Sequence, residues 1–209
     1  MVTRGQFLER PALVPVKDVV MEGLWHRGAR RPSLLIIPPV PEEGGSMDHV
    51  VAAEVAWAAA TRGFPTLRFN FRGTGGSQGE RSTGAELFTD AEAALRLLSE
   101  NAAVARAACL AIGGSAGVAL ELAQRHPGVC GVCLVSPMGV GAADLAALHL
   151  PLRVILAEND LRQARAALAA AVTEAGGRLE LIDRADHTFT ANLPEVGRKA
   201  AEFLTSLEV

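Results

Sequence analysis

The chain has 209 residues, of which 49% are hydrophobic and 21% are charged, and its formal net charge is −3. This length fits a single domain over residues 1–209 that buries a substantial core. The weak negative charge, an aromatic content of 4% and the absence of tyrosine argue against nucleic acid and membranes as partners.

Short apolar runs alternate with longer amphipathic runs along the chain. The segment 14–25 predicts an antiparallel pair of strands, and Ser46 is a plausible cap for the first helix. The remaining runs predict strands at 33–37, 66–71, 109–112, 132–136, 154–158 and 179–182, and helices at 48–62, 84–100, 118–125, 162–175 and 193–207. This alternation predicts an α/β fold with a mostly parallel central sheet and helices on both faces.

A serine stands between glycines where a predicted strand meets a predicted helix. Residues 113–117 read G-G-S-A-G and fit the pattern G-x-S-x-G, in which a serine is held at the tip of a sharp turn. The glycines leave room for neighbouring backbone, and the following helix directs N–H groups at the site. The pattern therefore predicts Ser115 as a catalytic nucleophile.

A serine nucleophile needs a base, and three histidines follow Ser115 in the sequence. Ligands of such sheets bind beyond the carboxyl ends of the strands. His126 falls at a helix end and His149 in a loop before a proline, whereas His187 follows the last predicted strand. We therefore expect His187 to be the base.

The base in turn needs an acid that orients it. Asp160 opens the loop after the strand at 154–158 and is the preferred candidate. Glu158, Asp144 and Asp186 stay open as alternatives, because each also lies close to a strand end.

These features resemble those of the α/β-hydrolases, and more narrowly of small lidless bacterial hydrolases related to the dienelactone hydrolases. The resemblance covers nearly the whole chain. It rests on the segments 39–48, 67–79, 113–117, 158–160 and 185–187. It implies Ser115 as nucleophile, Asp160 as acid and His187 as base.

One departure from the family concerns the loop after the first parallel strand. The family usually has His-Pro-His-Pro there, where this chain has Pro-Pro-Val-Pro at 38–41. An oxyanion hole needs two backbone N–H donors, and proline has none. We expect the donors to be the amides of Ala116 and Val40.

Substrate access follows from the short segment between the strands at 132–136 and 154–158. It is too short for a lid domain, which predicts an open active site. Its shallow apolar rim is expected to include Val40, Met138, Leu161 and Phe189, although each could instead pack structurally. Arg72 could bind a carboxylate or, as we favour, hold its own glycine-rich turn.

The sequence thus predicts a serine hydrolase that cleaves a carboxylic ester or thioester through an acyl-serine intermediate. A peptidase or amidase, and a noncatalytic binding module on the same scaffold, remain alternatives. The substrate would be a small-molecule or carrier-tethered acyl group, with no cofactor and no metal site, since the five histidines lack ligand spacing. Three cysteines and no apolar leader indicate a cytoplasmic protein of unknown oligomeric state.

Overall fold

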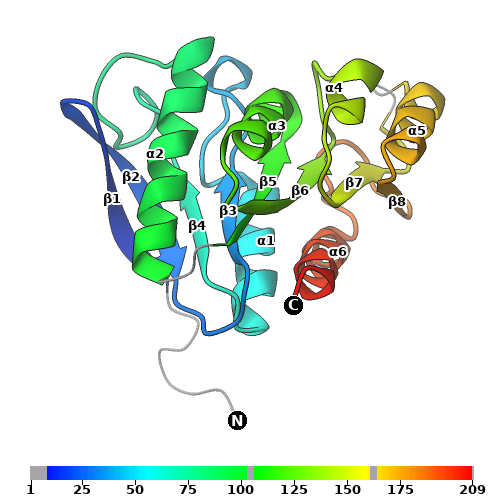
Figure 1. Ribbon diagram of the computed structural model, residues 1–209, viewed down its shortest axis with the longest axis horizontal. Coiled ribbons are helices and arrows are strands. Elements are labelled where there is room, and N and C mark those ends of the chain that lie inside the picture. The colour runs from blue at the N-terminus through cyan, green and yellow to red at the C-terminus, as the bar shows by residue number, and fades with distance from the viewer. Residues whose placement is uncertain (1–8, 103–105, 161–163, 209) are drawn as a thin grey trace.

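The computed structural model describes residues 9–102, 106–160 and 164–208. An eight-stranded sheet runs through the molecule in the order β1-β2-β4-β3-β5-β6-β7-β8 (Figure 1). β2 pairs antiparallel with both β1 and β4, and each neighbouring pair from β4 through β3 to β8 is parallel. The strands are β1 (Arg10–Val16), β2 (Val19–His26), β3 (Ser33–Ile37), β4 (Thr66–Phe69), β5 (Ala107–Ile112), β6 (Val129–Val135), β7 (Leu152–Ala157) and β8 (Arg178–Ile182).

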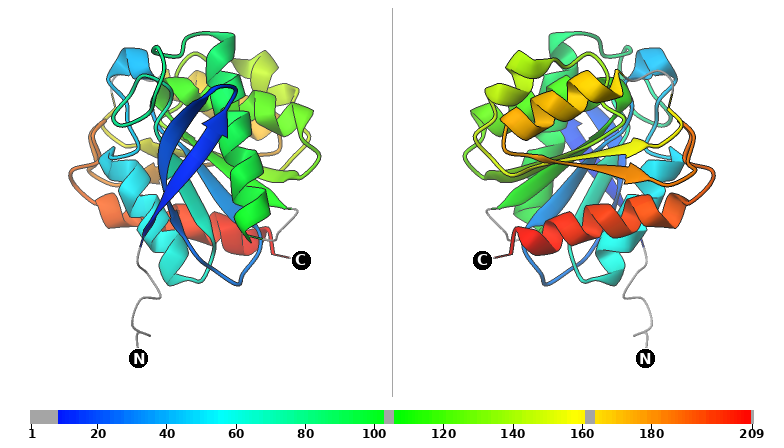
Figure 2. Two further views of the ribbon diagram at one scale, coloured as in Figure 1. Left: turned by 90° about the vertical axis from the view of Figure 1, so that its left-hand side faces the viewer. Right: turned by 90° about the vertical axis from the view of Figure 1, so that its right-hand side faces the viewer.

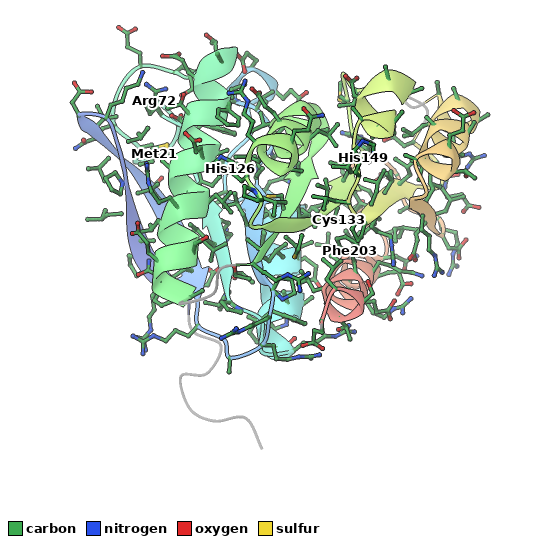
Figure 3. All side chains as sticks on the ribbon, in the orientation of Figure 1. Met21, Arg72, His126, Cys133, His149 and Phe203 are labelled. Atoms are coloured by element: carbon green, nitrogen blue, oxygen red, sulfur yellow. The ribbon has the colours of Figure 1, made fainter. Side chains whose placement is uncertain are left out.

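Helices cover both faces of this sheet, as predicted (Figure 2). One face carries α2 to α5, whose apolar side chains such as Leu95 and Leu120 join one core layer. The other carries α1 and α6, and Cys133 of β6 and Phe203 of α6 both belong to this second layer (Figure 3). The helices are α1 (Val50–Thr61), α2 (Ala85–Ala102), α3 (Ala116–Arg125), α4 (Ala142–Ala146), α5 (Arg165–Glu174) and α6 (Leu193–Ser206).

The four central strands are buried along their whole length. This is why β3, β5 and β6 read as nearly continuous apolar runs, whereas β1 at the edge alternates between exposed and buried residues. α1 and α6 pack side by side beneath them, and Gly197 lets the two helices approach closely. A Cβ atom at Gly197 would lie 2.8 Å from the Cβ of Ala58.

The order of the strands defines where a ligand site can form. From β3 the chain passes to β4 on one side and then returns to β5 on the other side of β3. Connections at such a switch point diverge and leave a crevice at the carboxyl ends of the strands. The loop after β3, which contains the 3-10 turn η1 (Pro41–Glu43), and the turn after β5 meet at this point.

The glycine-rich loop after β4 is anchored by a buried ion pair. Arg72 donates from Nε to Oδ1 of Asp90 at 2.6 Å, and its backbone N–H donates to Oδ2 at 3.0 Å. Asp90 is fully buried in α2 and also accepts from the hydroxyl of Ser82. The favoured prediction that Arg72 holds its own loop is therefore confirmed.

The residue that caps α1 differs from the predicted one. His49, not the predicted Ser46, caps α1, and its Nδ1 accepts from the N–H of Val51 at 3.3 Å. Ser46 instead accepts from the N–H of Asp48 in the preceding turn.

Residues 136–151 between β6 and β7 hold only the short α4, so the expected absence of a lid domain holds there. No described helix is long and apolar enough to cross a bilayer.

Candidate active site

Asp160 and His187 form a hydrogen-bonded pair at the carboxyl edge of the sheet. Asp160 follows β7 and His187 follows β8, and Oδ2 of Asp160 lies 2.9 Å from Nδ1 of His187. The Asp160 side chain is 1% exposed and that of His187 39% exposed. Because a carboxylate only accepts, Nδ1 carries the proton and Nε2 is the nitrogen that can exchange one with a substrate.

The loop around His187 holds the imidazole in this position. Oδ1 of Asp186 accepts from both the N–H and the hydroxyl of Thr188, and Phe189 donates its N–H to the carbonyl of Asp186. Phe189 is 1% exposed and adopts a left-handed backbone with φ of 54°. Asp186, an alternative candidate for the acid, thus serves its own loop instead of contacting the ring.

The turn after β5 has glycine at its tip. β5 continues through Ile112, and Gly113 then takes the left-handed backbone, with φ of +62°, that a nucleophile at such a turn requires. The next residues form the 3-10 turn η2 (Gly113–Ser115), from which α3 continues. The tip of the turn therefore lies two residues before Ser115 and carries no side chain.

Ser115 lies beneath this turn and is 0% exposed. Its Oγ lies 2.9 Å from the carbonyl oxygen of Ile112 and 3.3 Å from that of Ile37, and it accepts from the N–H of Ile112. The hydroxyl thus ties the end of β5 to the end of β3. The prediction that Ser115 presents its hydroxyl at the exposed tip is wrong for this structure, because the strand extends to Ile112 and fixes the turn at Gly113.

Because the tip of the turn is Gly113, the N–H groups available as oxyanion donors differ from the predicted ones. The N–H of Ala116 donates to the carbonyl of Gly113 inside the turn, so the expected role of Ala116 is wrong. The residue after the tip is Gly114, whose N–H points out of the turn to Oε2 of Glu43 at 3.2 Å. Among the hydrogen bonds of the described residues, none uses the N–H of Val40, which therefore stays a candidate for the second donor.

The carboxylate of Glu43 lies directly over the tip of the turn. A Cβ atom built on Gly113 would be 2.9 Å from its Oε2, and one built on Gly114 would be 2.5 Å from its Oε1. Glu43 ends the 3-10 turn η1, and its N–H donates to the carbonyl of Val40 at 3.0 Å. A carboxylate thus occupies the space that a side chain at the tip would use.

A cavity of about 180 Å³ opens between Glu43 and His187. Two of the predicted rim residues, Met138 and Phe189, line it; Val40 does not, and Leu161 lies outside the described residues. Ser136 is a further wall residue, 2% exposed and left-handed with φ of 43°. The lining consists of Pro39, Glu43, Gly44, Gly45, His49, Ile112, Gly113, Ser136, Met138, His187 and Phe189.

His49 brings a second imidazole to the wall of the cavity. Burial lowers the pKa of His49, and the neighbouring charge of His187 lowers it further. Within the described parts of the chain, no group of three or more His, Cys, Asp or Glu side chains could hold a metal ion. The chemical groups available at the cavity thus include two imidazoles, one carboxylate, the hydroxyl of Ser136 and backbone N–H donors.

Comparison with known proteins places the chain in a family. The family model for serine aminopeptidase S33 matches residues 43–158, which is more than half of the chain. The protein belongs to this family. The matched region includes Glu43 and the turn at Gly113 but ends before Asp160 and His187.

Curated relatives of this S33 family member are uncharacterised proteins. One from Rickettsia prowazekii is 35% identical over 108 residues, which cover 51% of this chain and 45% of the relative. One from Mycobacterium tuberculosis is 32% identical over 159 residues, which cover 72% of this chain and 54% of the relative. The chain thus spans about half the length of the curated relatives it matches.

A solved structure from Xanthomonas campestris, described as an α/β serine hydrolase without a lid, shares the fold. It aligns with a TM-score of 0.83 at 18% identity, over 100% of this chain and 98% of that chain. The dienelactone hydrolase of Anabaena variabilis aligns at 0.81 and 19% identity, over 97% and 99%. The expected α/β-hydrolase fold without a lid is therefore confirmed for this S33 family member.

The family's turn pattern also fits a second register of the same sequence. Residues 111–115 read A-I-G-G-S, with small residues two before and two after Gly113. Sequence reasoning missed Gly113, Gly114, Glu43, His49 and Ser136 as site residues. The signal for the correct register was the predicted strand end at Ile112, because the left-handed residue of the turn directly follows the strand.

Proposed function

We propose that the protein hydrolyses a small ester or thioester in the cavity beside His187, without an acyl-Ser115 intermediate. The observation that carries this proposal is the 2.9 Å bond between Asp160 and His187. A buried carboxylate on Nδ1 fixes the tautomer and stabilises the imidazolium, so that Nε2 can give a proton to a leaving group and take one from water.

The cavity restricts the acyl group that the reaction can use. A volume of about 180 Å³ lies below the roughly 300–1,000 Å³ of sites for drug-sized ligands. A short acyl group such as acetyl fits this space, while the rest of the substrate would remain outside, since no lid domain covers the opening. This favours a small or carrier-tethered acyl substrate over a long-chain ester.

Acyl transfer to Ser115 has no support from the geometry. Its hydroxyl would have to leave the contacts with Ile112 and Ile37 and pass through the turn to reach the cavity. An aminopeptidase activity is also less well supported, because amine leaving groups need close positioning and no specificity domain is present among the described residues.

The experiment compares single variants with p-nitrophenyl acetate and an acetyl thioester as probes. We expect His187→Ala to lower kcat by about 10²- to 10⁴-fold and Asp160→Asn to lower it substantially. Ser115→Ala is expected to keep most of the activity of the folded protein, as is the control His149→Ala, since His149 is exposed. Equal losses in Ser115→Ala and His187→Ala would contradict the proposal.

A noncatalytic binding module is the second candidate, and the glycine at the tip of the turn favours it. In that case wild type and His187→Ala would turn over both probes at the same background rate. Acetate and other short carboxylates would then still bind at the cavity, which NMR shifts of the His187 and His49 rings would report.

A further inference from the structure

Glu43 is the one carboxylate among the described cavity-lining residues. Its Oε2 lies 2.9 Å from the Cβ position of Gly113 and 3.2 Å from the nitrogen of Gly114. A nucleophilic side chain at the tip of the turn would extend from that Cβ position into the same space. The carboxylate thus lies where the family's turn presents its reactive atom.

The backbone sets this position before any substrate binds. The carbonyl of Val40 accepts from the N–H groups of both Glu43 and Gly45, which closes the turn. Gly45 cannot carry a side chain here, because its Cβ would lie 2.0 Å from the carbonyl oxygen of Pro39. Glu43 therefore extends from a fixed turn towards Gly114.

We propose that Glu43 is the nucleophile of this site and that the substrate is a small acyl thioester. This deepens the proposed function and rests on it, since it assigns the group that attacks in the hydrolysis. The N–H of Gly114 holds an oxygen of Glu43 itself. The oxyanion that this donor can stabilise is therefore one that forms on the carboxyl carbon of Glu43.

The leaving group decides between thioester and ester. A carboxylate is a weak base, and it displaces only groups that leave readily. A thiol has a pKa near 8.5, whereas an alcohol resembles water, near 15.7. An alkoxide would return to the acyl carbon faster than it departs, but a thiolate can leave.

The two steps balance in atoms and charge. In the first, an oxygen of Glu43 attacks the acyl carbon, the C–S bond breaks, and the thiolate takes the proton of the His187 imidazolium. This leaves a mixed anhydride on Glu43.

In the second step, neutral His187 takes a proton from water, and the resulting hydroxide attacks the carboxyl carbon of Glu43. The oxyanion on that carbon faces the N–H of Gly114 as the bond to the acyl group breaks and the acyl carboxylate leaves. Glu43 then releases a proton to solvent.

The decisive experiment follows oxygen from water into the protein. The wild-type chain is incubated with S-acetyl-N-acetylcysteamine in heavy-oxygen water, digested and analysed by tandem mass spectrometry. We expect heavy oxygen in the side chain of Glu43 and none in that of Glu42. Heavy oxygen in acetate alone, with none in Glu43, would mean direct attack by water and would overturn the assignment.

Two matched variants separate this inference from the proposed function. Glu43→Gln should lower thioester turnover at least about 100-fold, while Glu42→Gln should stay near wild type, because Glu42 makes no described hydrogen bond to the turn. An alkyl ester of the same acyl group, whose leaving group is an alkoxide, should react roughly 100-fold more slowly than the thioester.

The outcomes are distinct. Loss of activity in His187→Ala with full activity in Glu43→Gln would leave hydrolysis standing and remove Glu43 as nucleophile. A fluorophosphonate probe that labels wild-type Ser136 and abolishes turnover would do the same. Cleavage of p-nitrophenyl acetate but not of the thioester would overturn the assignment of Glu43 and of a thioester substrate while leaving hydrolysis standing. Failure of the wild-type protein to cleave either probe would overturn both proposals.

Discussion

The hydroxyl of Ser115 and the carbonyl oxygen of Ile112 lie 2.9 Å apart on the underside of the turn after β5. The same hydroxyl also accepts from the N–H of Ile112, so Ser115 bonds both backbone groups of the last residue of β5. Its contact with the carbonyl of Ile37 adds a link to β3. The residue therefore contributes to the stability of the site.

Ser115→Ala should lower the free energy of unfolding by about 1–3 kcal/mol, because buried backbone groups lose their partner. Urea unfolding followed by circular dichroism measures this. Ser99→Ala is the control, since Ser99 bonds only the carbonyl of Leu95 on the partly buried side of α2. Equal stability of the two variants would show that the Ser115 contacts contribute nothing specific.

Gly113→Ser in a Glu43→Ala background should create a serine nucleophile. Glu43→Ala removes the carboxylate that lies 2.9 Å from the new Cβ, and the Asp160–His187 pair supplies the base. The left-handed backbone costs about 1–3 kcal/mol for a residue other than glycine. Labelling by a fluorophosphonate probe, mapped to residue 113, reports the outcome.

The control for this gain is Gly113→Ser with Glu43 retained, which should label much more weakly because the carboxylate crowds the hydroxyl. Labelling at Ser115 in any of these proteins would contradict a turn whose tip is Gly113.

The serine between glycines shows what a short pattern can and cannot decide. Sequence reasoning placed Asp160 and His187 in loops that the structure brings together, because the carboxyl ends of parallel strands meet at one edge. It misplaced the tip of the turn, because G-x-S-x-G and A-I-G-G-S overlap in this glycine-rich segment. Only the pairing of Ile112 with Val135 in the sheet fixes where β5 ends.

His49→Asn should reduce the acid sensitivity of the fold. Burial, aided by the charge of His187, lowers the pKa of His49 below its ordinary value near 6.5. A histidine that is harder to protonate when folded contributes stability that is present above that value and is lost as the pH falls below it. Asparagine keeps an acceptor for the N–H of Val51 and does not titrate.

We therefore expect wild type to lose more free energy of unfolding than His49→Asn between about pH 7.5 and pH 5.5. Urea midpoints at the two pH values measure the difference. Identical losses in both proteins would mean that His49 titrates alike in the folded and unfolded chains.

Asp90→Asn should destabilise the loop after β4. The substitution leaves the Arg72 guanidinium without its buried counter-charge, and breaking such a pair costs about 3–5 kcal/mol. Thermal unfolding measures the loss. Glu86→Gln is the matched control, since Glu86 lies 3.6 Å from Arg72 but is exposed, and its removal should cost less than about 1 kcal/mol.

The cysteines should be unreactive in the native protein. All three are buried free thiols, and burial raises the pKa of Cys109 and of Cys133 to about 12. Because the thiolate is the reactive form, a disulfide reagent should modify none of them at neutral pH and all three in urea. Rapid native labelling would indicate local opening of β5 or β6.

The strand–helix order was readable from the sequence because central strands buried on both faces are continuous apolar runs. The cap of α1 could not be predicted in this way, because Ser46 and His49 can both accept an N–H. Only the folded backbone shows that His49 is the one that caps α1. No feature of the sequence identified Glu43 as a site residue either. An exposed glutamate in a proline- and glycine-rich loop resembles an ordinary surface residue. Only the structure shows that it lies over the turn at Gly113.

The close contact at Gly197 carries a consequence for the chemistry. α1 follows the loop that holds Glu43, and α6 follows the loop that holds His187, so each of these two side chains is tethered to one member of a single helix pair. A bulkier residue at 197 would push these helices apart and change the spacing between carboxylate and imidazole without touching either group. The first and last helices thus act together as one support that sets the distance between the Glu43 carboxylate and the His187 imidazole.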